Sequence, residues 1–240
     1  SAIRGSAAVV CRSANLAHRL KDAGAEANKL KVIYNGVDTG IFRPRNRGVV
    51  RRELSLAAEQ AVLLFIGNYL PVKNPFLLIR AHAELNRRRS GRGEPPARLV
   101  LIGDGPLRPA MEKAIADTGD RNNVDLRSRE TPMEIARWMN AADLLCLTSH
   151  NEGFPNVILE AMASGLKVVS TDVGGIHELV THSGRGSLVA AGDLDAYVGA
   201  LEEALGCVDF PREDVCDPDW SWENTAKDYG SVIKSAIGAS

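Results

Sequence analysis

The sequence predicts an α/β fold built on a doubly wound parallel sheet. Short runs rich in leucine or β-branched residues alternate with longer segments of helical period. The runs lack the polar alternation of strands with one wet face, so both faces of the sheet are expected to be covered by helices. The predicted strands are AAVV (7–10), LKVIY (30–34), AVLLFIG (61–67), RLVLIG (98–103), NVDLR (123–127), DLLCLTS (143–149), LKVVSTD (166–172) and GSLVA (186–190).

Irregular passages divide the chain. Residues 35–48 carry Asn-Gly, a proline and three arginines without strand or helix period, which is typical of a linker. Residues 210–222 form a second irregular passage, ahead of a final amphipathic helix. The stretch 86–98 combines charge, glycine and proline, and is expected to be an exposed loop. The core domain is therefore expected to run from about residue 45 to residue 217.

Composition indicates an ordinary globular protein. The chain has 240 residues, of which 45% are hydrophobic and 25% charged, enough for a substantial buried core. The formal net charge of -1 gives no overall attraction to nucleic acid or to an anionic membrane, and we expect the basic clusters at 43–52 and 87–89 to be solvated. No stretch approaches the ~20 apolar residues of a membrane-spanning helix. The four cysteines show no metal-ligand spacing and are expected to be reduced cytoplasmic thiols: Cys11, Cys146, Cys207 and Cys216.

The candidate ligand site is one edge of the predicted sheet. In open parallel sheets, ligands bind beyond the carboxyl ends of the strands, where loops meet helix N-termini. Four loops rich in glycine or proline are expected at this edge, and each opens a helix. They are GNYLPVKNP (67–75), GDGPL (103–107), SHNEGFPN (149–156) and DVGGIHE (172–178).

The third of these loops leads into a helix with a free amino end. Pro155 suits the first helical turn, because its missing N–H would have no partner there, and the helix is expected to stop at Gly165. The N–H groups of Asn156, Val157 and Ile158 would face the loop. Such an end favours an anion, for example a diphosphate, by roughly 0.3 to 1 kcal/mol.

Two acids flank that helix end. Glu152 lies just ahead of it, and Glu160 lies about a turn and a half inside the helix. A carboxylate at Glu160 accepts two hydrogen bonds at once, which matches the paired hydroxyls of a ribose. The two acids would then bracket opposite ends of one ligand, with phosphates between them. The alternative is that Glu152 is a first-turn helix charge and Glu160 a solvated residue.

The other loops add a cation and two glycines. Lys73 precedes Asn74 and Pro75, which are interpreted as a helix cap and first turn, and its charge could neutralise a diphosphate. Gly174 and Gly175 permit close approach of the backbone to a phosphate or sugar. An exposed lysine at a loop end and a tight-turn glycine pair are the structural alternatives.

Competing motifs are absent or incomplete. GDGPLRPA lacks the third glycine of G-x-G-x-x-G, and no P-loop is present. The acid pairs in DLD (193–195) and DPD (217–219) are interpreted as caps or turns, and the five histidines form no ligand cluster. No metal site is predicted.

These residues resemble a known family. Glu152-Gly-Phe-Pro-Asn-Val-Ile-Leu-Glu160 is similar to the E-x7-E signature of retaining GT-B glycosyltransferases of group one, glycosyltransferase family 4. Further blocks resemble that family in the expected order and cover nearly the whole chain. They are VIYNGVDTGIFRP, LLFIGNYLPVKNPFLLIRAHAEL, LVLIGDGPLRPAME, WMNAADLLCLTS and VVSTDVGGIHELV.

The resemblance implies a division into parts. The family fold is two Rossmann-like domains facing each other across a cleft, and this chain resembles the second, C-terminal one, which binds the donor. Residues 1–44 would be a remnant of the acceptor domain and the linker, 45–217 the nucleotide-sugar binding domain, and 218–240 the C-terminal helix that crosses back. Most of the acceptor domain would be missing from this chain.

The resemblance also implies residue roles. Glu160 would hold the ribose hydroxyls, Glu152 the hydroxyls of the donor sugar, and Lys73 the diphosphate, so that Glu152 and Lys73 are the catalytic candidates. The backbone of 153–157, which comprises Gly153, Phe154, Pro155, Asn156 and Val157, would contact sugar and phosphate. The family usually has an arginine directly after Gly67, where this sequence has Asn68. One of two phosphate cations is therefore missing from its usual position.

The implied activity is sugar transfer with retention of configuration, without metal or cofactor. The donor substrate would be a nucleotide-diphosphate sugar of the UDP or GDP type, and helix termini with Lys73 would stabilise the departing diphosphate. The acceptor is unknown, nucleic acid is not an expected partner, and the missing half could associate peripherally with a membrane. The implied setting is cytoplasmic polysaccharide or glycolipid biosynthesis. The alternatives are a non-catalytic nucleotide-binding or scaffolding domain, favoured by Asn68, and a sugar-nucleotide epimerase of similar fold.

Overall fold

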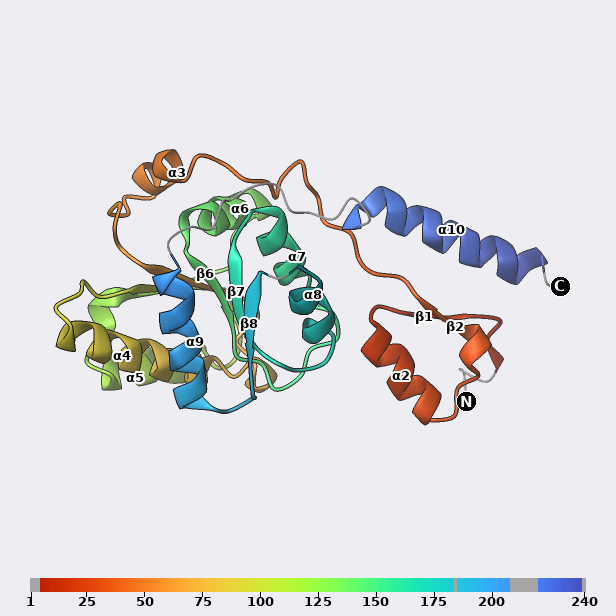
Figure 1. The fold of residues 1–240 in the computed structure, drawn as a ribbon, viewed down its shortest axis with the longest axis horizontal. Helices are drawn as coiled ribbons and strands as arrows, with labels where there is room; N and C mark the ends of the chain where they lie inside the picture. The colour runs from red at the N-terminus through yellow and green to blue at the C-terminus, as the bar shows by residue number, and fades with distance from the viewer. Residues whose placement is uncertain (1–4, 184, 208–219, 239–240) are drawn as a thin grey trace.

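The structure is a computed structural model that describes residues 5–183, 185–207 and 220–238. Its main element is a six-stranded sheet of order β5-β4-β3-β6-β7-β8, in which every neighbouring pair is parallel (Figure 1). The strands are β3 (Val62–Ile66), β4 (Arg98–Ile102), β5 (Val124–Arg127), β6 (Leu144–Leu147), β7 (Lys167–Thr171) and β8 (Gly186–Val189). The predicted fold class is confirmed.

The strand order reverses between β3 and β6. From β3 the chain first builds outward through β4 to β5, then returns to pair β6 with the other side of β3, with Leu63 opposite Leu144. The loops that follow β3 and β6 therefore leave the sheet at the same point in opposite directions. Such a reversal opens a crevice at the carboxyl edge, where ligands of doubly wound folds bind.

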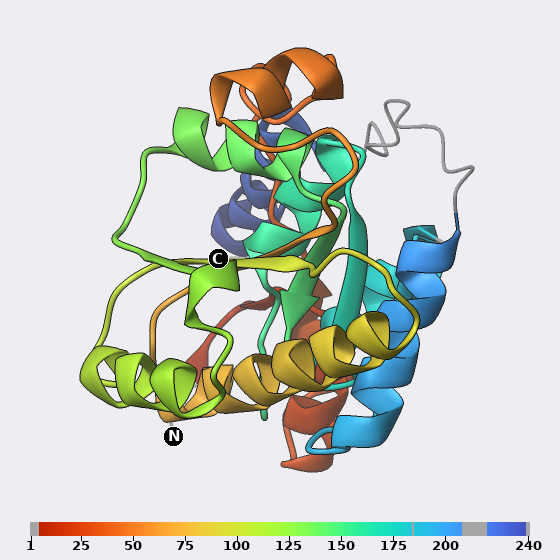
Figure 2. The ribbon, with the colours of Figure 1, turned by 90° about the vertical axis from the view of Figure 1, so that its left-hand side faces the viewer.

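Helices cover both faces of the sheet, as the apolar strands require. One face carries α4 (Pro75–Gly91), α5 (Arg108–Asp117) and α9 (Leu194–Gly206), and the other carries α3 (Arg47–Glu53), α6 (Pro132–Ala141), α7 (Asn156–Ala163) and α8 (Ile176–Ser183) (Figures 1 and 2). The core is split by the sheet into two clusters. Leu64 and Leu145 face α6 and α7, whereas Leu63 and Phe65 face α4 and α9.

A small N-terminal unit lies beside α8. It consists of β1 (Val9–Cys11), α2 (Ala14–Asp22), a 3₁₀ turn (Ala27–Lys29) and β2 (Leu30–Val32), which pairs in parallel with β1. Figure 1 shows α10 (Trp222–Gly238) running along this unit, away from the main sheet. A bridge between Val37 and Ser221 joins the segment after β2 to the start of α10. The proposed roles of these parts as remnant, donor domain and crossover helix stay predictions.

All eight predicted strands are present, but two predictions about loops need correction. The linker ends at Asn46, whose side chain accepts from the N–H of Val49 and caps α3. The stretch 86–98 is not all loop, because α4 continues to Gly91. Ion pairs of Glu84 with Arg87 and Arg88, three and four residues on, stabilise this end of the helix.

Arg51 was expected to be solvated with its cluster and is instead buried. Its side chain is 3% exposed and lies beneath α6, where it bonds the carbonyl oxygen of Ala141 at 2.9 Å and that of Ala57 at 2.9 Å. The carboxylate of Asp143 lies 3.4 Å away and also pairs with Arg47. Because these carbonyl and carboxylate oxygens accept its hydrogen bonds, the guanidinium of Arg51 can be buried without leaving an unpaired charge.

Some predictions fall outside the described residues. They include Cys216, the DPD pair at 217–219 and most of the irregular passage at 210–222. Asp193, by contrast, caps α9 as predicted, because its side chain accepts from the N–H of Ala196 at 2.9 Å. No helix in the described ranges is both long and apolar enough to cross a bilayer.

Candidate functional site

Lys73 and Glu152 meet at the point where the strand order reverses. Lys73 follows β3 and Glu152 follows β6, and the ammonium Nζ lies 2.6 Å from Oε1 and 2.8 Å from Oε2 of the carboxylate. The Glu152 side chain is 8% exposed and that of Lys73 is 25% exposed. The hydroxyl of Ser149 donates a further hydrogen bond to Oε1 of Glu152 at 2.6 Å.

Backbone contacts hold the two loops together. The hydroxyl of Thr148, at the end of β6, lies 3.1 Å from the carbonyl oxygen of Lys73 and 2.9 Å from that of Asn74. The N–H of His150 donates to the carbonyl of Val72 at 2.8 Å. Asn74 has φ of 45° and makes no side-chain capping bond, whereas Pro75 begins α4 as predicted. This left-handed residue turns the chain from the lysine loop into the helix.

The amino end of α7 differs in detail from the prediction. Pro155 is the N-cap residue rather than part of the first turn, and α7 begins at Asn156. The N–H of Ile158 is engaged, because it donates to the carbonyl of Pro155 at 3.1 Å. Within the described residues the N–H groups of Asn156 and Val157 have no acceptor. Two backbone donors, not three, are therefore available to an anion at this helix end.

The side chain of Asn156 is tied to the segment after β2. Its Oδ1 accepts from Nδ2 of Asn35 at 2.6 Å. Because Asn35 is buried, this bond fixes the first residue of α7 against the segment that follows β2. The sequence showed no sign of this contact, since 121 positions separate the two residues.

Glu160 lies in the second turn of α7 and is half-buried. Burial raises the pKa of its carboxyl to about 7. The described residues offer its carboxylate no hydrogen bond or ion pair. Half-burial and a raised pKa do not favour the alternative of a solvated surface residue, whereas the ribose role of Glu160 stays a prediction. An acid that is partly shielded from water and has no partner among the described residues can accept hydrogen bonds from a ligand, which is what a ribose role would require.

Gly174 and Gly175 pack against the Glu152 loop itself. A Cβ on Gly174, which has φ of +59°, would lie 1.7 Å from the carbonyl oxygen of Glu152. A Cβ on Gly175 would lie 2.3 Å from the carbonyl oxygen of Gly153 and 3.1 Å from Cβ of Ser13. The close approach in the structure is between two loops of the chain, whereas the predicted approach was to a phosphate or sugar. Contact of these glycines with a ligand stays a prediction.

The loop after β3 is anchored beneath the neighbouring strands. The hydroxyl of Tyr69 lies 2.9 Å from the carbonyl oxygens of Leu101 and Arg127, at the ends of β4 and β5. Just before it, the exposed Asn68 accepts through Oδ1 from Nη2 of Arg129 at 3.2 Å. Gly103 is required by the close packing here, because a Cβ on it would lie 1.9 Å from the carbonyl oxygen of Gly67.

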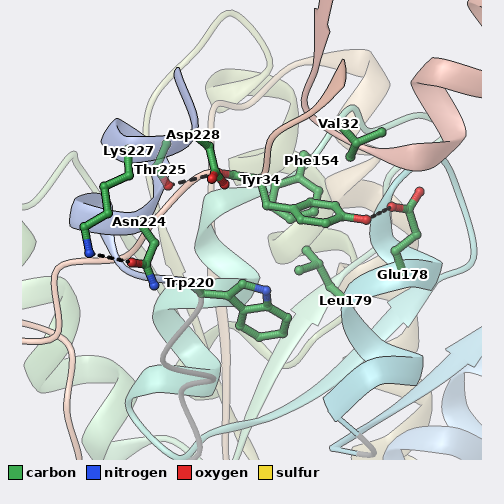
Figure 3. A pocket seen from close by; sticks show the side chains of 10 residues that line it. All are labelled: Val32, Tyr34, Phe154, Glu178, Leu179, Trp220, Asn224, Thr225, Lys227 and Asp228. Carbon is green, nitrogen blue, oxygen red and sulfur yellow. Dashed lines mark hydrogen bonds between the residues drawn. The ribbon is translucent and has the colours of Figure 1, made fainter. Parts of the chain in front are cut away.

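A cavity of about 550 Å³ lies next to these loops. Figure 3 shows Tyr34, Phe154 and Trp220 around it, with Glu178 on one side and Lys227 on the other. The ring of Phe154 packs on Tyr34 with centroids 5.2 Å apart. Of the predicted site residues only Phe154 lines this cavity, and Glu152, Glu160 and Lys73 do not. The cavity therefore lies beside the carboxyl-edge site rather than within it.

Sequence reasoning missed four contacts in and around the site: Ser149 with Glu152, Asn35 with Asn156, Arg129 with Asn68, and Glu178 with the backbone N–H of Asn15. Ser149 lies three positions before Glu152 in the same loop, so a serine so close to a buried acid was a usable signal. The others reach across the fold, and nothing local in the sequence marks them. No three metal-ligating side chains gather anywhere in the part of the chain that the structure describes.

Comparison with known proteins identifies the family. The model of glycosyl transferases group 1 matches residues 46–213. A D-inositol 3-phosphate glycosyltransferase of Nocardia farcinica is 33% identical over 204 residues, which cover 82% of this chain and 45% of that protein. The protein of the same name from Segniliparus rotundus is 34% identical over 229 residues, 92% of this chain and 50% of that one. The chain thus spans about half the length of these curated relatives.

Solved structures share the fold. A sucrose-phosphate synthase of Thermosynechococcus elongatus matches 97% of this chain and 59% of its own, with a TM-score of 0.83 and 23% identity. The Anabaena protein HepE, in complex with UDP and glucose, matches 98% of this chain and 65% of its own, with a TM-score of 0.81 and 24% identity. These likenesses show the α/β architecture of GT-B glycosyltransferases. With the family model matching most of its length, the chain belongs to the glycosyl transferases group 1 family.

Proposed function

We propose that this chain binds a nucleotide-diphosphate sugar and presents it for transfer to an acceptor with retention of configuration. The observation that carries the proposal is the meeting of Lys73 and Glu152 at the strand reversal, beside the open amino end of α7. The cation and the backbone donors there suit the diphosphate of such a donor, and the anion suits its sugar hydroxyls. The UDP and glucose held by HepE support a UDP-type donor, with a GDP type as the alternative.

Each group at the site has one part of the donor to recognise. Glu160, half-buried and without a partner among the described residues, would accept the ribose hydroxyls. The N–H groups of Asn156 and Val157 would donate to the diphosphate, and Glu152 would accept hydroxyls of the sugar. The backbone of 153–157 would line the sugar and phosphate subsite between the two acids.

Lys73 and Glu152 would separate when the donor binds. Lys73 is the more exposed partner, so its ammonium is free to turn toward a diphosphate, while Ser149 keeps hold of the Glu152 carboxylate. The freed carboxylate then accepts sugar hydroxyls. At the transition state the diphosphate leaves with added negative charge, which Lys73 and the α7 amides stabilise without a metal or cofactor. No protein nucleophile is assigned.

The acceptor would bind outside the described site. Because the chain covers about half of its curated relatives, we propose that an acceptor domain belongs to the complete protein and that residues 1–44 and 218–240 attach to it. The acceptor, and peripheral membrane association through that domain, belong to the same proposal. Cytoplasmic location and a role in polysaccharide or glycolipid biosynthesis follow from it.

Calorimetry with UDP, GDP and ADP tests donor binding on this chain. We expect one of the diphosphates to bind and Glu160→Ala to abolish that binding. Glu203→Ala is the matched control, since Glu203 is exposed near the end of α9, which runs away from the carboxyl edge. If no nucleotide binds, the scaffolding alternative stands and the proposal is wrong.

Retention is tested with the acceptor domain in place. The anomeric configuration of the product, read by proton NMR, should equal that of the donor sugar. An inverted product would contradict the mechanism, and an epimerised nucleotide sugar without transfer would favour the epimerase alternative.

A further inference from the structure

The charge of Lys73 is already balanced in the structure. Its ammonium contacts both carboxylate oxygens of Glu152, so the pair as a whole is neutral. A diphosphate brings at least two negative charges, and the α7 amides offer only partial positive charge. A donor held by this loop alone would therefore keep a large uncompensated charge. A second cation at the carboxyl edge would compensate the remaining negative charge of the diphosphate.

Arg129 is placed to be that cation. It follows β5, is exposed, and donates from Nη2 to the neutral side chain of Asn68 at 3.2 Å. Nearby arginines are committed elsewhere, since Arg127 pairs with Glu130 at 2.8 Å and Arg108 with Glu112 at 3.3 Å. Arg129 itself makes no ion pair with any described residue.

The turn after β4 lets Arg129 reach across it. β4 lies between β3 and β5, so a tall loop there would separate Arg129 from Asn68. Instead Gly103 and Gly105 are pressed onto the β3 loop: a Cβ on Gly105 would lie 2.6 Å from the carbonyl oxygen of Tyr69. Because this turn packs so closely on the loop after β3, it does not block the side chain of Arg129 from reaching Asn68.

Tyr69 holds the loop after β3, which carries Asn68, close to the loop after β5, which carries Arg129. Its hydroxyl contacts the carbonyl oxygen of Arg127, two positions before Arg129, and its own backbone follows Asn68 directly. The N–H of Tyr69 also donates to the carbonyl of Asp104 at 2.9 Å. The two loops that carry Arg129 and Asn68 are thus held together by a buried tyrosine. The amide of Asn68 then orients the guanidinium above them.

We propose that Arg129 contacts the diphosphate of the donor, held in place by Asn68, and so supplies from the β5 loop the charge that Lys73 shares with Glu152. The proposal rests on the proposed function. A guanidinium reaches two phosphate oxygens at once, which suits a bridging diphosphate better than a single ammonium does.

Calorimetry of this chain with UDP, UMP and uridine tests the assignment; if wild type prefers GDP, the guanine series takes their place. Arg129→Ala should weaken the diphosphate about tenfold or more, because a charged hydrogen bond is lost, and change the affinity for the nucleoside by less than about twofold. Arg129→Lys should recover part of the loss. Placing the cation on the other loop, as Asn68→Arg with Arg129→Ala, should recover more.

Arg52→Ala is the control, because Arg52 is an exposed arginine on α3, ahead of the opposite end of β3. If Arg129→Ala binds the diphosphate like wild type while Glu160→Ala does not bind it, the Arg129 assignment is wrong and the proposed function stands. Equal losses for nucleoside and diphosphate would assign Arg129 to the nucleoside and overturn the proposal. If wild type binds no nucleotide, both fall together.

Discussion

Glu178 on α8 caps the first turn of α2 through the backbone N–H of Asn15, which donates to Oε1 at 2.7 Å. The second carboxylate oxygen accepts from the N–H of Ala14 at 2.8 Å and from the hydroxyl of Tyr34 at 3.1 Å. The first N–H groups of a helix have no acceptor within the helix. In α2, the carboxylate of Glu178, from another part of the fold, is the acceptor for two of them. The carboxylate of Glu178 therefore joins the N-terminal unit to α8.

Glu178→Ala should weaken the attachment of the N-terminal unit to α8. The loss of an acidic helix cap predicts a decrease of about 1 to 2 kcal/mol in the free energy of unfolding. Amide hydrogen exchange at Ala14 and Asn15 should accelerate more than exchange in the central strands. Glu178→Gln, which keeps one acceptor, should fall between the two. Unchanged exchange at α2 would show that the cap does not hold the unit.

Gly174→Ala should disrupt the Glu152 loop. The new Cβ would meet the carbonyl oxygen of Glu152 at 1.7 Å, and φ of +59° is itself unfavourable for alanine. We expect a loss of at least about 2 kcal/mol in urea unfolding, together with weaker nucleotide binding. Gly192→Ala is the matched control: φ is +86°, but no atom lies within 4 Å, so only about 1 kcal/mol of backbone strain is expected. Equal losses in the two variants would rule out the clash.

The strands and the edge that carries the site could be predicted because their signals are local. Each strand is an uninterrupted apolar run, and each site loop follows such a run and opens a helix. The buried position of Glu160 could not be predicted, since periodicity alone does not say which neighbours cover a polar residue inside a helix. The pairing of Lys73 with Glu152 depends on the strand order, which the sequence pattern does not specify.

Long-range charge pairs explain the wrong predictions. The arginines around Arg51 predict a solvated side chain, yet Asp143, 92 positions away, allows its burial. Glycine and charge predict a loop from residue 86, whereas α4 continues and Glu84 pairs with Arg87 and Arg88 along it. Ion pairs at this helical spacing are visible in the sequence and favour the longer helix.

Lys73→Ala should destabilise the protein through Glu152. The substitution leaves a carboxylate that is 8% exposed and that has, among the described residues, only the Ser149 hydroxyl as a side-chain partner. We expect a loss of about 2 kcal/mol at pH 7, below the cost for a fully buried pair because Lys73 is partly exposed. The double variant Lys73→Ala with Glu152→Gln should regain most of this loss in urea unfolding. If the two substitutions are additive, the ion pair is not coupled.

Glu160 predicts a distinct dependence of stability on pH. Its folded pKa is about 7 against an ordinary value of 4.5, so the folded state binds the proton more tightly than the unfolded state does. The resulting stability is full below pH 4.5 and is lost as pH rises through 7, a change of up to about 3 kcal/mol. Other carboxylates act in the opposite direction, since pairing with arginines lowers the pKa of Glu84, Glu94 and Glu202. The difference between wild type and Glu160→Gln isolates the contribution of Glu160.

Urea unfolding of both proteins between pH 4 and 9 should therefore give curves that diverge above pH 5, with Glu160→Gln the more stable at pH 8. Parallel curves would show that burial does not raise the pKa of this carboxyl. Saturating nucleotide adds a second test, because in the proposed role ribose hydroxyls would donate to the ionised acid and so lower its pKa in the complex. Nucleotide affinity of wild type should then rise with pH through 7 in a way that Glu160→Gln does not share. The two measurements together separate a carboxyl that is merely buried from one that binds the ribose.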